Sequence, residues 1–164
     1  MGVYMENYKV TGFRPVNGIF DISSGFGENR TSLAQKLKLK RKTHGGIDFR
    51  CSVGTQVYAF LDGLVQLVGE TDGFGYRIWL YHDLPGRANA IRSCYAHLSK
   101  WYVVPGQKIR QGELIGLSGG RPGDPGSGSS TGPHLHFETR TLPDDEPFEP
   151  RFLGNTPPSD NVVY

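Results

Sequence analysis

Short apolar runs alternate with glycine turns along the chain from residue 49 to residue 137. The runs are rich in β-branched and aromatic side chains and recur about every ten residues, as the strands of an antiparallel sheet do. They lie at residues 57–60, 64–68, 76–81, 93–98, 101–104, 114–117 and 134–139. No window of eleven residues combines helical periodicity with capping residues. The pattern therefore predicts an all-β fold.

Three segments differ from this pattern. Residues 1–30 are extended and contain several glycines, and we expect them to pack on the core. Residues 31–43 hold five basic side chains and no acidic one, which indicates a solvated loop or edge strand, with binding to an acidic polymer as the alternative. Residues 141–164 mix acidic residues with prolines, which is typical of a C-terminal tail that packs on the surface or is partly disordered.

Length and charge exclude several classes of protein. The chain has 164 residues, enough for one compact domain. Its net charge of +2 does not indicate a nucleic-acid partner, although it is compatible with an acidic polymer as substrate. No apolar run approaches the roughly 20 residues that span a bilayer, so we expect no membrane insertion. The first six residues lack the basic start and apolar stretch of a signal peptide, and nothing in the sequence indicates the oligomeric state.

The two cysteines, Cys51 and Cys94, lie in separate β-like stretches, and neither belongs to a Cys-x-x-Cys pair. Free cysteine packs as a small apolar residue, so the sequence favours two buried thiols. A single disulfide between them is the alternative. Two isolated cysteines cannot close a thiolate zinc site alone.

His134 and His136 lie in one predicted strand, where alternation places both imidazoles on the same face about 7 Å apart. Leu135 then points to the opposite face. Two neighbouring imidazoles are unusual in a packed core, because each needs polar partners when it is buried. The pair is therefore a candidate metal site.

A second candidate motif is His44-Gly45-Gly46-Ile47-Asp48. The two glycines oppose a helix and favour a tight loop that leads into a strand and brings His44 and Asp48 to one point. Histidine with a carboxylate suits zinc. Together with one of the two later histidines they would supply three protein ligands and leave a fourth position for water, which is typical of a catalytic zinc site. The two other histidines, His97 and His82, would fit the surface on spacing alone, and His82 is predicted to lie there.

Several motifs in this order resemble the LytM/lysostaphin-type zinc metallopeptidases, peptidase family M23, over about residues 18–140. The motifs are His44-Gly45-Gly46-Ile47-Asp48, Tyr95-Ala96-His97-Leu98 and Gly132-Pro133-His134-Leu135-His136-Phe137-Glu138, with matching glycine turns at residues 54–59, 62–65 and 105–116. The resemblance implies an antiparallel β-sheet or sandwich of the M23, duplicated hybrid motif-like, type, in which long loops form a groove. Residues 31–140 would be the catalytic domain.

The resemblance also implies a role for each candidate. His44, Asp48 and His136 match the three ligands of Zn²⁺, and His97 and His134 match the two histidines that flank the catalytic water. It does not divide acid and base roles between these two. The implied reaction is hydrolysis of a peptide bond in bacterial peptidoglycan, in a stem peptide or cross-bridge. The protein would then act on the cell wall, in the extracellular or periplasmic space or on a virion.

Two features depart from many relatives. No tyrosine precedes the first ligand within residues 31–43, where relatives carry one thought to help hold the transition state. The loop at residues 118–132 is long and leads directly to His134, so we expect it to form one wall of the substrate groove, with a tolerated surface insertion as the alternative. Residues 120–126 of this loop resemble phage-borne members, which favours an endolysin or tail-associated hydrolase of a bacteriophage; an excised domain of a larger secreted enzyme fits equally well.

Two other functions compete with hydrolysis. The first is a cell-wall-binding or structural module, for instance of a phage tail, that keeps the fold without cleaving. A complete set of candidate ligands argues against it. The second is a biotinyl or lipoyl carrier domain, which would need a lysine where this chain has Ser118-Gly119-Gly120.

Overall fold

The computed structural model describes residues 9–18, 21–28 and 44–153, and these form twelve β-strands and no helix. The described part of the chain accordingly contains no helix long and apolar enough to cross a membrane. The strands are β1 (Thr11–Gly12), β2 (Ile22–Ser24), β3 (Ile47–Arg50), β4 (Gln56–Tyr58), β5 (Gly63–Thr71), β6 (Gly75–His82), β7 (Ile91–Trp101), β8 (Lys108–Ile109), β9 (Leu114–Ser118), β10 (His134–Thr141), β11 (Pro147–Phe148) and β12 (Arg151–Phe152). The prediction of an all-β fold is confirmed.

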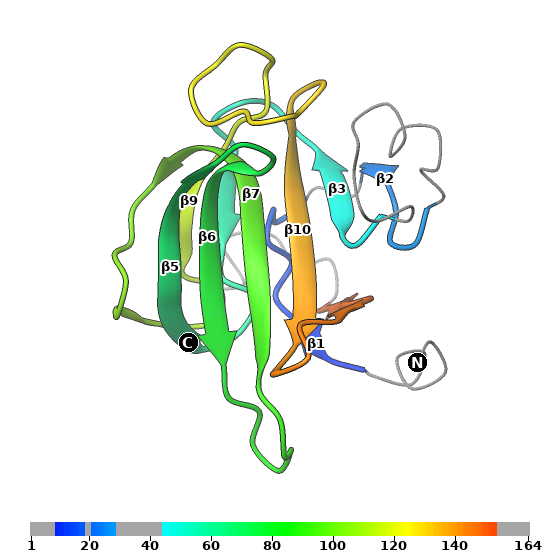
Figure 1. Ribbon diagram of the computed structural model, residues 1–164, viewed down its shortest axis with the longest axis vertical. Helices are drawn as coiled ribbons and strands as arrows, with labels where there is room; N and C mark the ends of the chain where they lie inside the picture. Colours follow the sequence, from blue (N-terminus) through cyan, green and yellow to red (C-terminus); the bar gives the residue numbers. More distant parts are fainter. Residues whose placement is uncertain (1–8, 19–20, 29–43, 154–164) are drawn as a thin grey trace.

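Ten of the strands form one antiparallel sheet (Figure 1). Its main order is β2-β3-β10-β7-β6-β5-β8, with β11 on β10 and with β9 between β7 and β4. β10 lies between β3 and β7, so the two later histidines are placed beside the strand that begins just after His44. β1 and β12 pair in parallel as a separate two-stranded sheet.

The main core contains aromatic rings from both ends of the described chain. Phe60 contacts Phe137 at 5.4 Å between ring centroids, and both rings contact Phe152. Burial of a phenylalanine in such a cluster contributes several kcal/mol, since its truncation to alanine typically costs about 3–5 kcal/mol. The opposite, outer face of β6 and β7 has a smaller cluster of Trp79, Cys94 and Ala96, with Phe74 packed against it.

Two expectations change in detail, and a third falls outside the described residues. The expected strand at residues 101–104 is not a separate one, because only Trp101 belongs to a strand and it ends β7. Within residues 141–164, β11 and β12 pair with β10 and β1, and Phe148 is buried in the core. The basic side chains at residues 36–42 lie outside the described residues.

Both cysteines are buried free thiols, as the sequence favoured. His82, which was expected on the surface, is fully buried. Its Nδ1 lies 2.8 Å from the carbonyl oxygen of Asp62 and its Nε2 lies 2.7 Å from the hydroxyl of Ser93. Its sequence neighbours gave no sign that a carbonyl group just before β5 and a hydroxyl group of β7 would satisfy the ring, so the surface prediction was wrong.

Candidate metal centre

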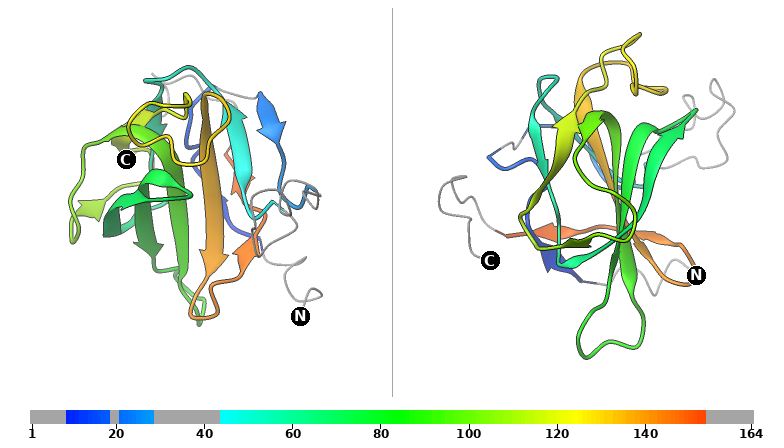
Figure 2. Two further views of the ribbon diagram at one scale, coloured as in Figure 1. Left: turned by 45° about the horizontal axis from the view of Figure 1, so that its top comes forward. Right: turned by 90° about the vertical axis from the view of Figure 1, so that its left-hand side faces the viewer.

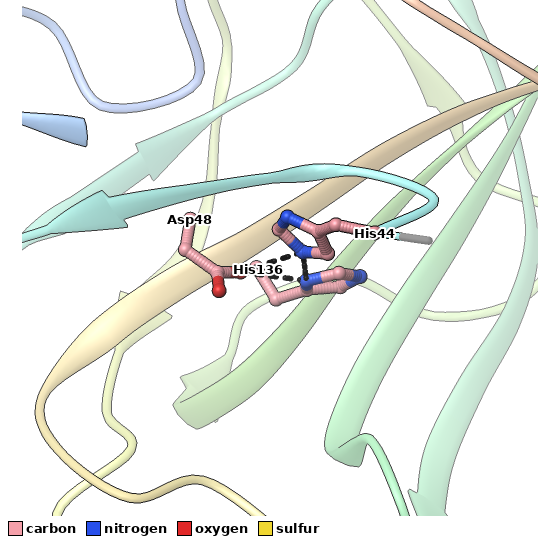
Figure 3. Close-up of side chains that lie close together, drawn as sticks. All are labelled: His44, Asp48 and His136. Atoms are coloured by element: carbon pink, nitrogen blue, oxygen red, sulfur yellow. Dashed lines mark hydrogen bonds and ion pairs between the residues drawn. The ribbon is translucent and has the colours of Figure 1, made fainter. Parts of the chain in front are cut away.

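Three side chains converge on one point at the beginning of β3 (Figure 3). His44 lies just before this strand and Asp48 lies on it. His136 lies on the neighbouring strand β10, where it pairs with Asp48. Gly46 makes the approach possible, since a Cβ there would meet the carbonyl oxygen of Phe137 at 2.3 Å. The loop therefore passes directly over β10, which only glycine allows.

The three donor atoms are close enough to share one ion. His44 Nε2 lies 3.1 Å from His136 Nδ1 and 3.3 Å from Asp48 Oδ1, and His136 Nδ1 lies 2.7 Å from Asp48 Oδ1. All three residues are buried. Zinc with bond lengths of about 2.0–2.1 Å in a tetrahedron holds its ligand atoms about 3.3 Å apart. Two nitrogens and one carboxylate oxygen at this spacing fit a zinc ion and leave its fourth position for water.

The two ligand rings are oriented through their other nitrogens. His44 Nδ1 lies 3.0 Å from both the carbonyl oxygen of Gly25 and the hydroxyl of Ser24. His136 Nε2 lies 2.8 Å from a carboxylate oxygen of Glu138. Carbonyl or carboxylate acceptors behind a ligand histidine fix the tautomer that presents a lone pair to the metal.

Electrostatics keep the carboxylates of the centre ionised. Burial tends to raise the pKa of Asp48, but the contacts with His136 and His44 outweigh it and hold this pKa well below its usual range. For Glu138, burial likewise acts upward, and the hydrogen bond and charge of His136 with the charge of Arg140 lower its pKa to about 2. An ionised carboxylate set is what a divalent cation requires.

A chain of charged groups extends from His136 along the outer face. Glu138 accepts a 2.7 Å hydrogen bond from Arg140 Nε, and Arg140 donates to Asp145 at 3.0 Å. Asp145 also accepts a 2.9 Å bond from Arg92 Nε. Glu138, Arg140, Asp145 and Arg92 thus each have a partner of opposite charge, which fixes the position of Glu138.

His97 and His134 lie beside the three ligands, with ring centroids 4.8 Å apart. His97 Nδ1 lies 2.8 Å from the carbonyl oxygen of Ser127, and His134 Nδ1 lies 2.7 Å from that of Gly132. A proton on each Nδ1 satisfies these carbonyl groups, so in the neutral ring the lone pair is on Nε2. His134 Nε2 lies 3.6 Å from Asp48 Oδ1, so this ring faces the ligand set. Burial, assisted by the neighbouring His134 and His136, lowers the pKa of His97 to about 3 and keeps it neutral.

A β-bulge places His97 on this face. Two residues of β7, Ala96 and His97, oppose one residue of β6, and His97 has a left-handed φ of 57°. Ala96 already pairs with His136 on the outer face, so strict alternation would turn His97 toward the core. The bulge redirects the side chain at a backbone conformation that non-glycine residues rarely adopt.

The loop between β9 and β10 lies at the end of the sheet where β10 begins, as both views of Figure 2 show. Its Gly126 carbonyl accepts a hydrogen bond from Tyr76 N, and its Ser127 carbonyl holds His97. An open hollow of about 580 Å³ lies between residues 70–72 and 123–128. The loop that was expected to line the groove therefore contacts the candidate site directly.

The structure brings together all five residues singled out in the sequence: His44, Asp48, His97, His134 and His136. Sequence reasoning missed the supporting groups. Glu138 lies two positions after His136, so strand alternation could have placed it on the same face. The carbonyl groups that hold His44, His97 and His134 have no side-chain signature.

The model of "Peptidase family M23" matches residues 42–150. The DD-carboxypeptidase/endopeptidase Mpg of Neisseria meningitidis is 37% identical over 119 residues, which are 73% of this chain and 24% of that protein. The glycyl-glycine endopeptidase ALE-1 of Staphylococcus capitis is 39% identical over 106 residues, 64% of this chain and 26% of that protein.

Among solved structures, a zinc-containing peptidase from Vibrio cholerae superposes with a TM-score of 0.63 at 29% identity. The match covers 82% of this chain and 39% of that one. The chain thus spans about a quarter of the length of the curated relatives that it matches.

Proposed function

Because the chain belongs to peptidase family M23, we propose that it is a zinc-dependent endopeptidase that hydrolyses peptide bonds in bacterial peptidoglycan, in a stem peptide or a cross-bridge. One observation carries this proposal. Three zinc-type donor atoms within 3.3 Å of one another lie beside two histidines whose Nδ1 atoms are both bound to carbonyl groups. A site that only bound the cell wall would not need His97 and His134 beside the three metal donors.

His44, Asp48 and His136 would hold the zinc ion. When bound, zinc acts as a Lewis acid on the scissile carbonyl group and lowers the pKa of water toward about 7. The protein's contribution is to keep Asp48 ionised and both histidine rings oriented, through Glu138 behind His136 and the carbonyl of Gly25 behind His44.

His97 and His134 would move protons. With Nδ1–H donated to a carbonyl group, Nε2 of either ring is a base that can accept a proton from the attacking water. The other ring, once protonated, can donate to the carbonyl oxygen as negative charge develops or to the departing amine. Holding Nδ1 fixes both tautomers, so no ring has to reorient during the reaction.

The place of action follows from the substrate. We infer that the protein acts on the cell wall, in the extracellular or periplasmic space or on a virion. The names of its relatives support a wall peptide as substrate: one is a DD-carboxypeptidase/endopeptidase and one a glycyl-glycine endopeptidase. These two names describe different bonds, so the bond cleaved by this chain has to be measured.

The test is mass spectrometry of fragments released from purified peptidoglycans of several cross-link types, with and without a zinc chelator. We expect one new amino terminus, released only when zinc is present. Absence of release from every wall by the zinc-loaded protein would refute the endopeptidase proposal and favour a non-cleaving module.

A further inference from the structure

Arg77 lies on β6 beside the candidate site. It is the single β6 residue that faces the two bulged residues Ala96 and His97 of β7. Its neighbours Tyr76 and Ile78 pack into the main core. Alternation along the strand therefore places the Arg77 side chain on the outer face, which also holds the metal centre.

The guanidinium group of Arg77 has no counter-charge among the described residues. Its Nε is buried without a hydrogen-bond partner, and none of the ion pairs between described residues includes it. The two other arginines of this face differ, since Arg92 and Arg140 both bind Asp145. A guanidinium stays charged at any physiological pH, and a half-buried charge without a partner is costly. In the described part of this face, Arg77 is therefore a cation that is available to an anionic ligand.

The positions on both sides of Arg77 carry little or no side chain. On β5 its partner is Gly69, where an added methyl group would meet no atom within 4 Å. On β7 it faces Ala96, whose side chain is a methyl group. The surface above Gly69 is therefore open, on the side of Arg77 that is away from His97.

We propose that Arg77 binds a carboxylate of the substrate peptide and so selects carboxylate-bearing stem peptides over neutral glycine bridges; this inference rests on the proposed function. The planar guanidinium pairs with a carboxylate through two parallel hydrogen bonds. Neighbouring strands lie about 4.8 Å apart, and an extended peptide advances about 3.3–3.6 Å per residue. We therefore expect the bound carboxylate within about three residues of the bond that His97 helps to cleave.

The test compares synthetic cross-linked stem peptides in which each free carboxyl group is replaced in turn by a carboxamide. For the zinc-loaded wild type we expect one replacement to lower kcat/KM by about 10- to 100-fold, the range of a charge-assisted hydrogen bond. Arg77→Gln should cleave the intact peptide as slowly as the wild type cleaves that amide. It should cleave the amide itself at the same rate as the wild type does. Arg77→Lys, which keeps the charge without the fork, should restore part of the preference.

Arg110→Gln is the matched control, because this exposed arginine follows β8 at the other end of β5. It should leave the preference unchanged, and zinc content and thermal unfolding should be equal in all four proteins. Equal cleavage of every amide and the intact peptide by the wild type would overturn the inference while the proposed function stands. Cleavage of none of them by the wild type would overturn both.

Discussion

Acidification should destabilise the folded protein through His82, which is far from the metal centre in the sheet. The ring is fully buried between Phe60, Ser93 and the carbonyl group of Asp62. Burial lowers the pKa of His82 from 6.5 to about 4, although the hydrogen bond to Asp62 and the charge of that residue act in the opposite direction. Neutral imidazole with its proton on Nδ1 satisfies both partners.

The sign and size of the effect follow from proton linkage. Between pH 6.5 and pH 4 the unfolded chain binds a proton at this position and the folded chain does not, so the free energy of unfolding falls as the pH falls. One pKa unit corresponds to about 1.36 kcal/mol. The contribution of His82 is therefore complete above pH 6.5, is reduced by about 2 kcal/mol at pH 5, and is reduced by about 3 kcal/mol at pH 4.

The assay is urea unfolding of the wild type and His82→Gln from pH 8 to pH 4, monitored by tryptophan fluorescence. A chelator is present throughout, so that metal release does not contribute to the change in unfolding free energy. Glutamine cannot take up the proton. The two proteins should differ most at pH 8, and their difference in unfolding free energy should shrink by about 3 kcal/mol by pH 4. A difference that stays constant over this range would refute the reasoning.

Two further substitutions test how the site is supported. Glu138→Gln should weaken zinc binding about 10- to 100-fold in a competition assay with a chelating dye, whereas the exposed Glu149→Gln should not change it; equal affinities would contradict the role of Glu138. Gly75→Ala would place a Cβ 1.9 Å from the carbonyl oxygen of Gly126 at a φ of 65°, so the loop that holds His97 should move, and kcat should fall about 10-fold or more with zinc retained. Gly73→Ala, in the same turn and with no atom within 4 Å, should keep normal turnover, and equal rates for the two variants would count against this account of the loop.

Much of this architecture could be predicted from the sequence, because side chains alternate between the two faces of a strand. His134, His136 and Glu138 share a face at period two, so their proximity could be predicted from spacing. His97 could not be placed in the same way. Its presence at the site depends on a bulge and a left-handed backbone conformation, and no local residue pattern marks either of them.

Whether a polar side chain is buried was also hard to predict. His82 was assigned to the surface because a histidine before a turn is usually exposed, but β6 lies between β7 and β5 and the ring is covered. Its polar partners come from residues 11 and 20 positions away. Tertiary pairing, which sequence spacing does not specify, decided the outcome.

The most direct test of the central claim is to measure bound zinc and peptidoglycan turnover in three alanine variants. His97→Ala and His134→Ala should keep one zinc ion per chain and lose turnover by about 10²- to 10⁴-fold, as expected for groups that transfer protons. His136→Ala should lose the zinc itself. Full turnover in either of the first two variants, or undiminished zinc affinity in the third, would contradict the assignment of the site.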